Sequence, residues 1–176
     1  VRTFQTIRLF GQMSVAENIM SGRHIKSSQS WWHGIVPTIG SRRDEKENWL
    51  KVQEQLEFFD LSEFAATPTD SLPYGLQRRV EMARAMAVEP TLLILDEPTS
   101  NLDMNAEASM FRAIREYAKD RTVLFVSHRF STVNEADRIL VLDEGQLVED
   151  GTHEQLMKIN GYYAAMVKHQ KESVRV

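Results

Sequence analysis

Two adjacent carboxylic acids follow a short aliphatic run in this sequence. The run is Leu92–Leu95, followed by Asp96 and Glu97, and prolines bound the segment on both sides. A run this short predicts a strand buried on both faces, because a helix would need more residues. Doubly wound sheets bind ligands just beyond the carboxyl ends of their strands. These acids could therefore hold Mg²⁺ beside a nucleotide phosphate and orient or deprotonate a water, unless they only cap the next turn.

Further polar residues stand at the ends of other expected elements. Gln5 follows a strand-like segment, Gly75 opens an expected helix, Asp103 lies in the loop after the aliphatic run, and His128 follows a second strand. A glycine at a helix start exposes N–H groups that suit a phosphate, although most such glycines only shape a turn. A histidine after a strand is more often structural. The order of these residues along the chain, rather than any one of them, predicts a phosphate-handling site.

The first half of the chain is predicted to be mainly helical. Ser14 and Glu17 form a capping box that predicts a short helix to about Met20, and 21–41 is expected to be a loop. An amphipathic helix is expected over 43–59. Its apolar stripe consists of Trp49, Val52, Leu56 and Phe59.

Strands alternate with helices in the second half of the sequence. After the central strand we expect a helix from 103 to about 119, a second buried strand over 122–126, and a third over 139–142. The other predicted elements are a turn at 61–64, a helix over 76–88, a strand over 146–149 paired with the third, and helices from 152 and from 161 to about 171. This order predicts a helical lobe inserted into an α/β sheet.

The composition excludes several classes of protein. The 176 residues carry a formal net charge of −4, with 26% charged and 42% hydrophobic residues, so no basic excess points to nucleic acid. There is no cysteine, which excludes disulfides and thiolate metal sites. No apolar run approaches the ~18–20 residues of a membrane span, and no signal-peptide pattern is present. We therefore expect contact with a membrane only through a protein partner.

With these motifs in order, the chain resembles the nucleotide-binding domain of ABC transporters over essentially its whole length. Phe4–Gln5 is similar to the Q-loop, Leu72–Arg78 to the signature motif, and Leu92–Glu97 to Walker B with its catalytic glutamate. Ser100–Asp103 is similar to the D-loop, and Ser127–Arg129 to the switch histidine. The resemblance implies ATP and Mg²⁺ as cofactors and a role as an ATPase coupled to transport.

The resemblance implies a role for each motif residue. Asp96 would help to hold Mg²⁺ through water, Glu97 would polarise the attacking water, and His128 would contact the γ-phosphate. Gln5 would sense the metal and the coupling to the membrane partner. The signature would touch a nucleotide held mainly by an opposite subunit. The residues expected to bind that nucleotide are Asp103 of the D-loop and four residues of the signature: Tyr74, Gly75, Leu76 and Gln77.

The fold implied by the resemblance is α/β, with a P-loop NTPase-like (RecA-like) sheet core and an inserted α-helical subdomain. The chain would be one ABC ATPase domain, with the helical subdomain over 14–88 and the core over 1–13 and 89–176. Its partners would be transmembrane subunits and a second nucleotide-binding domain in a homo- or heterodimer. It would lie at the cytoplasmic face of the cell membrane and bind no nucleic acid.

Two departures from the common family pattern affect this interpretation. The signature has Pro73 and Tyr74 where serine and glycine are common, a form similar to branched-chain amino-acid importer ATPases. The sequence also contains no G-x-x-x-x-G-K-[ST] run, which the family places before the Q-loop. We expect that segment to precede Val1, and we expect these residues alone to bind ATP weakly.

The two halves of the sequence point to different transporters. Phe4 to Glu97 is similar to branched-chain amino-acid importers, and Thr99 to Val167 is similar to ABC exporters with fused membrane domains. Branched-chain amino-acid import is the leading prediction, with an exporter cassette as the alternative. Two further alternatives are a non-catalytic module that lends its signature face to a complete cassette, and a non-transport ABC ATPase. The last usually carries coiled coils or paired cassettes, and the sequence has no heptad pattern or repeat.

Overall fold

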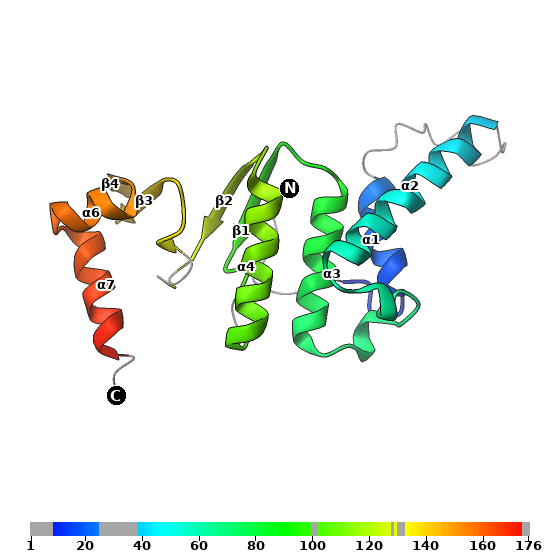
Figure 1. The fold of residues 1–176 in the computed structure, drawn as a ribbon, viewed down its shortest axis with the longest axis horizontal. Coiled ribbons are helices and arrows are strands. Elements are labelled where there is room, and N and C mark those ends of the chain that lie inside the picture. Colours follow the sequence, from blue (N-terminus) through cyan, green and yellow to red (C-terminus); the bar gives the residue numbers. More distant parts are fainter. Residues whose placement is uncertain (1–8, 25–38, 100–101, 128, 130–132, 174–176) are drawn as a thin grey trace. The chain divides into compact units, whose positions relative to one another are not determined.

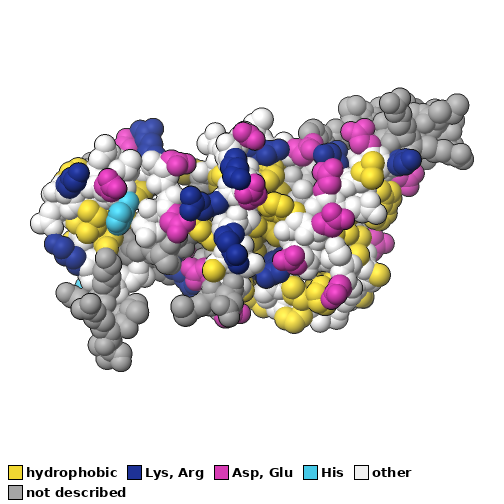
Figure 2. All heavy atoms as spheres, viewed as in Figure 1, with side chains coloured by type: hydrophobic (Ala, Val, Ile, Leu, Met, Phe, Trp, Pro, Cys, Tyr) yellow, Lys and Arg dark blue, Asp and Glu magenta, His cyan; other side chains and the backbone are white. Residues whose placement is uncertain are grey.

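The computed structural model describes residues 9–24, 39–99, 102–127, 129 and 133–173 (Figure 1). The chain divides into two compact units, a first unit over 1–126 and a second unit over 127–176. The subdivision predicted above, with a helical part over 14–88, stays a prediction. Figure 2 shows acidic and basic side chains interspersed on the visible face of the described part.

Helix α1 (Val15–His24) begins at the predicted capping box. The Ser14 hydroxyl accepts from the N–H of Glu17 at 3.3 Å, and the Glu17 carboxylate accepts from the N–H of Ser14 at 2.8 Å. Val15 and Ile19 are fully buried on its inner face. The helix continues to His24, so the prediction of an end near Met20 and of a loop from Ser21 was wrong at this boundary. Residues 25–38 lie outside the described part.

Helix α2 (Ile39–Phe58) starts before the predicted Arg43 and includes residues assigned above to the loop. Val52, Leu56 and Phe59 are buried as the apolar stripe predicts, whereas Trp49 is exposed. Trp49 lies nearer the amino-terminal end of α2, on the same stripe as Val52 but outside the core. After Phe59, η2 (Ser62–Phe64) and η3 (Thr69–Ser71) are single turns.

Helix α3 (Tyr74–Ala87) follows Pro73, which stands at its N-cap position. Figure 1 shows α3 between α1 and α4 in the first unit. Gly22 of α1 lies against the main chain of α3, because a Cβ atom built there would stand 2.5 Å from the carbonyl oxygen of Arg84. The two helices therefore pack with main chain close to main chain, which only a residue without a side chain permits.

Strands β1 (Leu92–Asp96) and β2 (Thr122–Val126) form a parallel pair, and α4 (Met104–Ala118) connects them. Parallel strands need such a crossover connection. Helix α4 packs on β2 through an edge-to-face contact of Phe111 and Phe125, with ring centroids 5.9 Å apart. The order of strand, helix and strand in this part of the fold is as the sequence predicts.

The predicted burial of these strands on both faces was wrong. Leu93 and Leu95 are fully buried, but Leu92 is exposed, and on β2 Leu124 is 47% and Val126 54% exposed. Helices α3 and α4 supply apolar partners for one face of the pair. Among the described residues, the outward-facing side chains of β2 have no comparable cover, which is why their exposure exceeds what an unbroken aliphatic run suggests.

The second unit contains a hairpin and two helices. Strands β3 (Ile139–Asp143) and β4 (Gln146–Gly151) are antiparallel, as predicted, and Glu144 and Gly145 in the turn both have positive φ values. Helix α6 (His153–Ile159) begins at a capping box of Thr152 and Gln155. The Glu149 carboxylate accepts from two N–H groups at the start of α7 (Tyr162–Ser173), at 2.7 and 2.9 Å. Side-chain oxygens thus accept from some of the N–H groups that have no helical partner at the start of both helices.

No helix in the described ranges combines the length and the apolar character that a crossing of a membrane requires.

We expect Gly22→Ala to lower the stability of the first unit by about 1–3 kcal/mol, because the added methyl group would collide with the Arg84 carbonyl. Alanine is the better helix former by about 1 kcal/mol, so the loss would appear in spite of its propensity. Urea unfolding followed by circular dichroism measures it. Gly75→Ala is the matched control, since its Cβ would meet Leu102 only at 3.8 Å. An unchanged or raised stability of Gly22→Ala would contradict the close packing.

Candidate functional site

The two acids predicted to do chemistry lie at the carboxyl end of β1. Asp96 is the last residue of the strand and pairs in register with Val126 of β2. Glu97 follows it with φ 47°, in the left-handed region. Both are partly exposed. The pair therefore lies at the sheet edge where doubly wound folds bind ligands.

The main chain of Glu97 is held from two sides. Its N–H donates to the carbonyl oxygen of Val126 at 3.0 Å, and its own carbonyl accepts from Nη2 of Arg78 on α3 at 3.3 Å. A residue other than glycine in the left-handed region costs about 1–3 kcal/mol and persists only when its surroundings impose it. Here β2 and α3 impose it together.

Arg78 reaches Glu97 from inside the core. Its side chain is 1% exposed and forms an ion pair with Glu81, 5% exposed, one turn further along α3. Burial raises the pKa of the Glu81 carboxyl, while Arg78 and Arg84 oppose that effect. Burial likewise lowers the pKa of Arg84. The pair thus carries two charges out of water, which is stable only with good mutual contacts.

Arg78 stands at the end of the predicted signature motif but was given no role there, and Glu81 was not predicted to belong to the site. Helical spacing could have found them, because they lie on the same stripe of α3 as the buried Met82 and Ala85. A charged pair three residues apart on a buried stripe indicates an internal ion pair. What spacing could not show is the third contact, from Arg78 to the carbonyl of Glu97.

The start of α3 is arranged as an open helix end. The N–H groups of Leu76 and Gln77 donate to the carbonyl of Pro73 at 3.0 and 3.1 Å. The N–H groups of Tyr74 and Gly75 come earlier and, as at the start of any helix, have no carbonyl one turn before them in the helix. Gln77 donates through Nε2 to the carbonyl of Leu72 at 2.9 Å, so its side chain closes the turn before the helix.

Gly75 does not have to be glycine for structural reasons. It lies in the first turn of α3, and a Cβ atom there would make ordinary van der Waals contact with Leu102. In the described part, the only glycine with positive φ is Gly145. The interpretation that Gly75 merely permits an unusual backbone angle is thus without support, and its predicted role at a phosphate stays a prediction.

Asp103 caps α4. Its carboxylate accepts from the N–H of Ala106 at 2.9 Å, and its carbonyl accepts from the N–H of Glu107 at 2.9 Å. Leu102 beside it is buried and lies near Gly75, so the structure brings this turn and the start of α3 together. The predicted contact of Asp103 with a nucleotide stays a prediction, and any such contact would involve a carboxylate that already holds a helix end.

Two predicted site residues, Gln5 and His128, lie outside the described part. In the residues that are described, no group of three or more His, Cys, Asp or Glu side chains is arranged to hold a metal ion. The Asp96 carboxylate fits Mg²⁺, because this hard cation prefers oxygen ligands and usually keeps several waters beside a phosphate.

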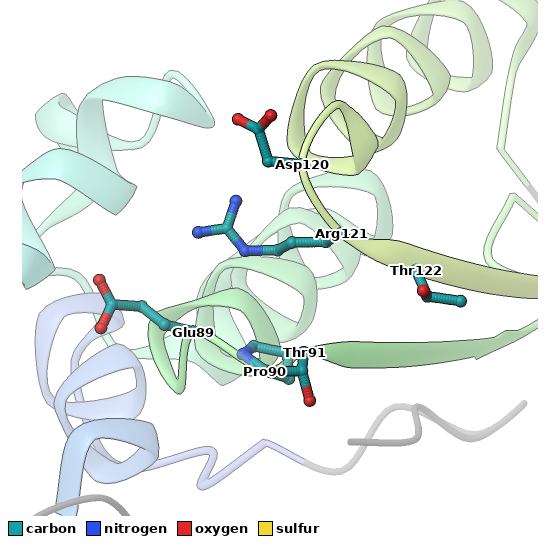
Figure 3. Close-up of a pocket in the computed structure, with 6 residues that line it drawn as sticks. All are labelled: Glu89, Pro90, Thr91, Asp120, Arg121 and Thr122. Atoms are coloured by element: carbon teal, nitrogen blue, oxygen red, sulfur yellow. The ribbon is translucent and has the colours of Figure 1, made fainter.

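A hollow in the first unit lies at the opposite end of the strands. It has a volume of about 600 Å³ and is lined by residues that precede or begin β1 and β2: Glu89, Pro90, Thr91, Asp120, Arg121 and Thr122 (Figure 3). Arg23 and Lys51 contact Glu89 at 3.2 and 3.5 Å, and Arg121 stacks over Tyr117. Glu89 and Arg121 thus already have partners, and the hollow lies away from Asp96 and Glu97.

We expect Arg78→Gln to destabilise the first unit by about 3–5 kcal/mol at pH 7, because it leaves the Glu81 carboxylate buried without its main partner. The folded-state pKa of Glu81 is raised by burial. Protonation of Glu81 therefore favours the folded variant, and the loss should shrink as the pH falls from 7 towards 5.

Urea unfolding at pH 7 and pH 5 measures this loss. Arg79→Gln is the matched control, because the Arg79 side chain points to Phe59 and Asp60 and is partly exposed. A loss of stability that is the same at both pH values would contradict the account of Glu81.

Comparison with known proteins supports the family assignment made from the motifs. The family model described as "ABC transporter" matches residues 1–100. A branched-chain amino acid transport ATP-binding protein, BraF of Pseudomonas aeruginosa, is 35% identical over 159 residues. That match covers 89% of this chain but 62% of the relative. The chain therefore spans less than two thirds of the length of this relative.

Exporters are similar to the chain as well. An ATP-dependent lipid A-core flippase of Mannheimia succiniciproducens is 46% identical over 100 residues, covering 57% of this chain and 17% of the flippase. The structure of a bacterial Atm1-family ABC exporter with ATP bound matches with a TM-score of 0.72 and 26% identity, over 94% of this chain and 27% of the exporter. The predicted P-loop NTPase fold of the ABC ATPases is thus confirmed, and the chain is similar both to a branched-chain amino acid transport protein and to an exporter. The chain belongs to the ABC transporter family, as part of its ATP-binding domain.

Proposed function

We propose that this chain forms part of an ATP-hydrolysing subunit that powers transport across a membrane. One observation carries the proposal: Asp96 and Glu97 end β1 side by side, and the main chain of Glu97 is held by both β2 and α3. A metal-holding acid followed by a fixed second acid suits in-line attack of water on a phosphate. The relatives named above support ATP as the nucleotide.

Each side chain would have a separate task in that reaction. Mg²⁺, when bound, would neutralise charge on the phosphate that is transferred. The Asp96 carboxylate would hold that ion, directly or through water. The Glu97 carboxylate would orient the attacking water and accept its proton. Tyr74 and Gly75 would present N–H groups to the phosphate of a nucleotide bound mainly by a second cassette.

The cargo we propose is a branched-chain amino acid, moved inward. The Pro73–Tyr74–Gly75 signature and the importer relatives from Pseudomonas aeruginosa and Escherichia coli favour this choice. Export is the second candidate, favoured by the flippase and by the exporter structure. In either case we propose transmembrane subunits and a second ATP-binding domain as partners, with contact to the cytoplasmic face of the membrane made through them. A phosphate-binding loop would have to complete the site, since these 176 residues contain no such motif.

We expect Glu97→Gln to reduce ATP turnover by about 10²–10⁴-fold while ATP binding persists, because the amide keeps the shape but cannot accept a proton. The assay uses the protein that carries this chain joined to a phosphate-binding loop, with phosphate release and equilibrium binding measured separately. Asp120→Asn, at the opposite end of the sheet, is the control for loss of one carboxylate. Turnover at the wild-type rate in Glu97→Gln would exclude Glu97 as the catalytic base.

We expect Gly75→Asp to fold normally but to fail in ATP-dependent dimerisation. The structure leaves room for a side chain at Gly75, so stability should be close to that of the original protein. A carboxylate at this helix end would oppose the phosphate of the partner's nucleotide, and like charges at such range cost on the order of several kcal/mol where water is partly excluded.

Size-exclusion chromatography with ATP and a hydrolysis-deficient complete cassette measures this dimer. Gly75→Ala is the matched control and should dimerise. If folded Gly75→Asp forms the dimer as well, the start of α3 is not a phosphate-binding end.

A further inference from the structure

A buried cation in α3 is connected to the residue proposed as the catalytic base. Arg78 lies in the interior of the first unit, and one arm of its guanidinium is paired with Glu81. The other arm donates to the main-chain carbonyl of Glu97 at 3.3 Å. Arginine is suited to this arrangement because its planar fork can hold two acceptors in fixed directions.

The ion pair gives that contact its rigidity. Glu81 follows Arg78 by one turn of the same helix, so the guanidinium is held by a carboxylate that is itself almost fully buried. The rotamer freedom of a long side chain is thereby lost on folding rather than at the moment of catalysis. The donor aimed at Glu97 is therefore fixed in place beforehand.

The contact acts on Glu97 at the point where its orientation is decided. The N–H of Glu97 is already fixed to Val126 of β2, and its left-handed φ of 47° is an unfavourable angle for glutamate. Without a donor at its carbonyl, rotation about the N–Cα bond of Glu97 towards a more favourable φ would change the direction of the carboxylate. Asp96 would be less affected, because it belongs to the β1–β2 ladder.

We propose that Arg78 is a positioning residue for Glu97: the buried Arg78–Glu81 pair fixes the main chain of Glu97 and so the direction of its carboxylate. This inference rests on the proposed ATPase function. It adds that the geometry of the water-activating acid depends on α3, the helix whose first turn carries Tyr74 and Gly75. Arg78 acts through Glu97 and has no task of its own at the phosphate.

The test uses variants that separate positioning from folding. Arg78→Gln combined with Glu81→Gln removes both charges and leaves neither buried alone. Arg78→Lys keeps the charge but lacks the fork, so it should rescue only part of the effect. Arg79→Gln is the matched control on the same helix, because its side chain contacts Phe59 and Asp60 instead. Thermal melting identifies the folded variants.

The first readout is hydrogen exchange of the Glu97 amide by NMR, measured on this chain. In the double variant we expect exchange to be faster by about tenfold or more, with the buried strand residues Leu93 and Leu95 unchanged. Equal protection of Glu97 in the double variant and in the original chain would overturn the proposal, whatever the activity assay shows.

The second readout is ATP turnover in the protein that joins this chain to a phosphate-binding loop. We expect kcat to fall by about 10–100-fold with KM within about twofold, since a small misplacement of a catalytic group affects the chemical step. In a Glu97→Gln background the double variant should cause no further loss. Full turnover in the double variant, with Glu97→Gln inactive, would overturn the positioning role of Arg78 but leave the proposed ATPase function in place. Full turnover in Glu97→Gln itself would instead remove the proposed function, and the inference with it.

Discussion

Two opposite charges lie buried on the inner face of α3, and one of them connects this helix to the end of β1. Neither Arg78 nor Glu81 could be buried alone, because an isolated ion in the interior loses its hydration without compensation. Paired, they leave one arm of the guanidinium for a further acceptor, and that acceptor is the carbonyl of Glu97. The end of β1, the left-handed turn and the start of α3 are therefore parts of one connected arrangement rather than three separate features.

This arrangement gives Asp96 and Glu97 different backbone constraints. Asp96 has the regular backbone of a paired strand, while Glu97 has an angle that must be imposed from outside. A regular strand backbone, as at Asp96, suits a side chain that holds an ion. An imposed backbone angle, as at Glu97, suits a side chain that must point to one position. The same two neighbours in sequence thus receive different constraints, one from β2 and one from β2 and α3 together.

Local capping patterns predicted two helix starts, whereas the start of α2 and the exposure of several apolar side chains were missed. The capping box predicted at Ser14 and the helix start predicted at Thr152 correctly located two helices, because a cap involves only a few neighbouring residues. The end of α1 was predicted too early because glycine usually weakens a helix. In this structure Gly22 stays in the helix and packs against the main chain of α3. The exposure of Trp49 and Leu124 was missed for a related reason: a stripe or a run shows which side chains are alike, not which neighbours cover them.

The candidate site was predicted to a similar extent. The order of Asp96 and Glu97 after a strand was readable, because it depends on sequence alone. The contact from Arg78 was not, since it joins residues far apart in the chain and depends on how α3 lies against β1. Gln5 and His128 lie outside the described residues, and their roles stay predictions.

The contact between Gly22 and the carbonyl of Arg84 also has a mechanical consequence. Where two helices touch through long side chains, a small displacement of one can be absorbed by rotamer changes in between. Here main chain lies against main chain, and a close-packed interior has little compressibility. A force that shifts α1 would therefore move α3 by nearly the same amount. The helix that contacts Glu97 would therefore move with α1 as a rigid body, because no layer of flexible side chains lies between them at this point.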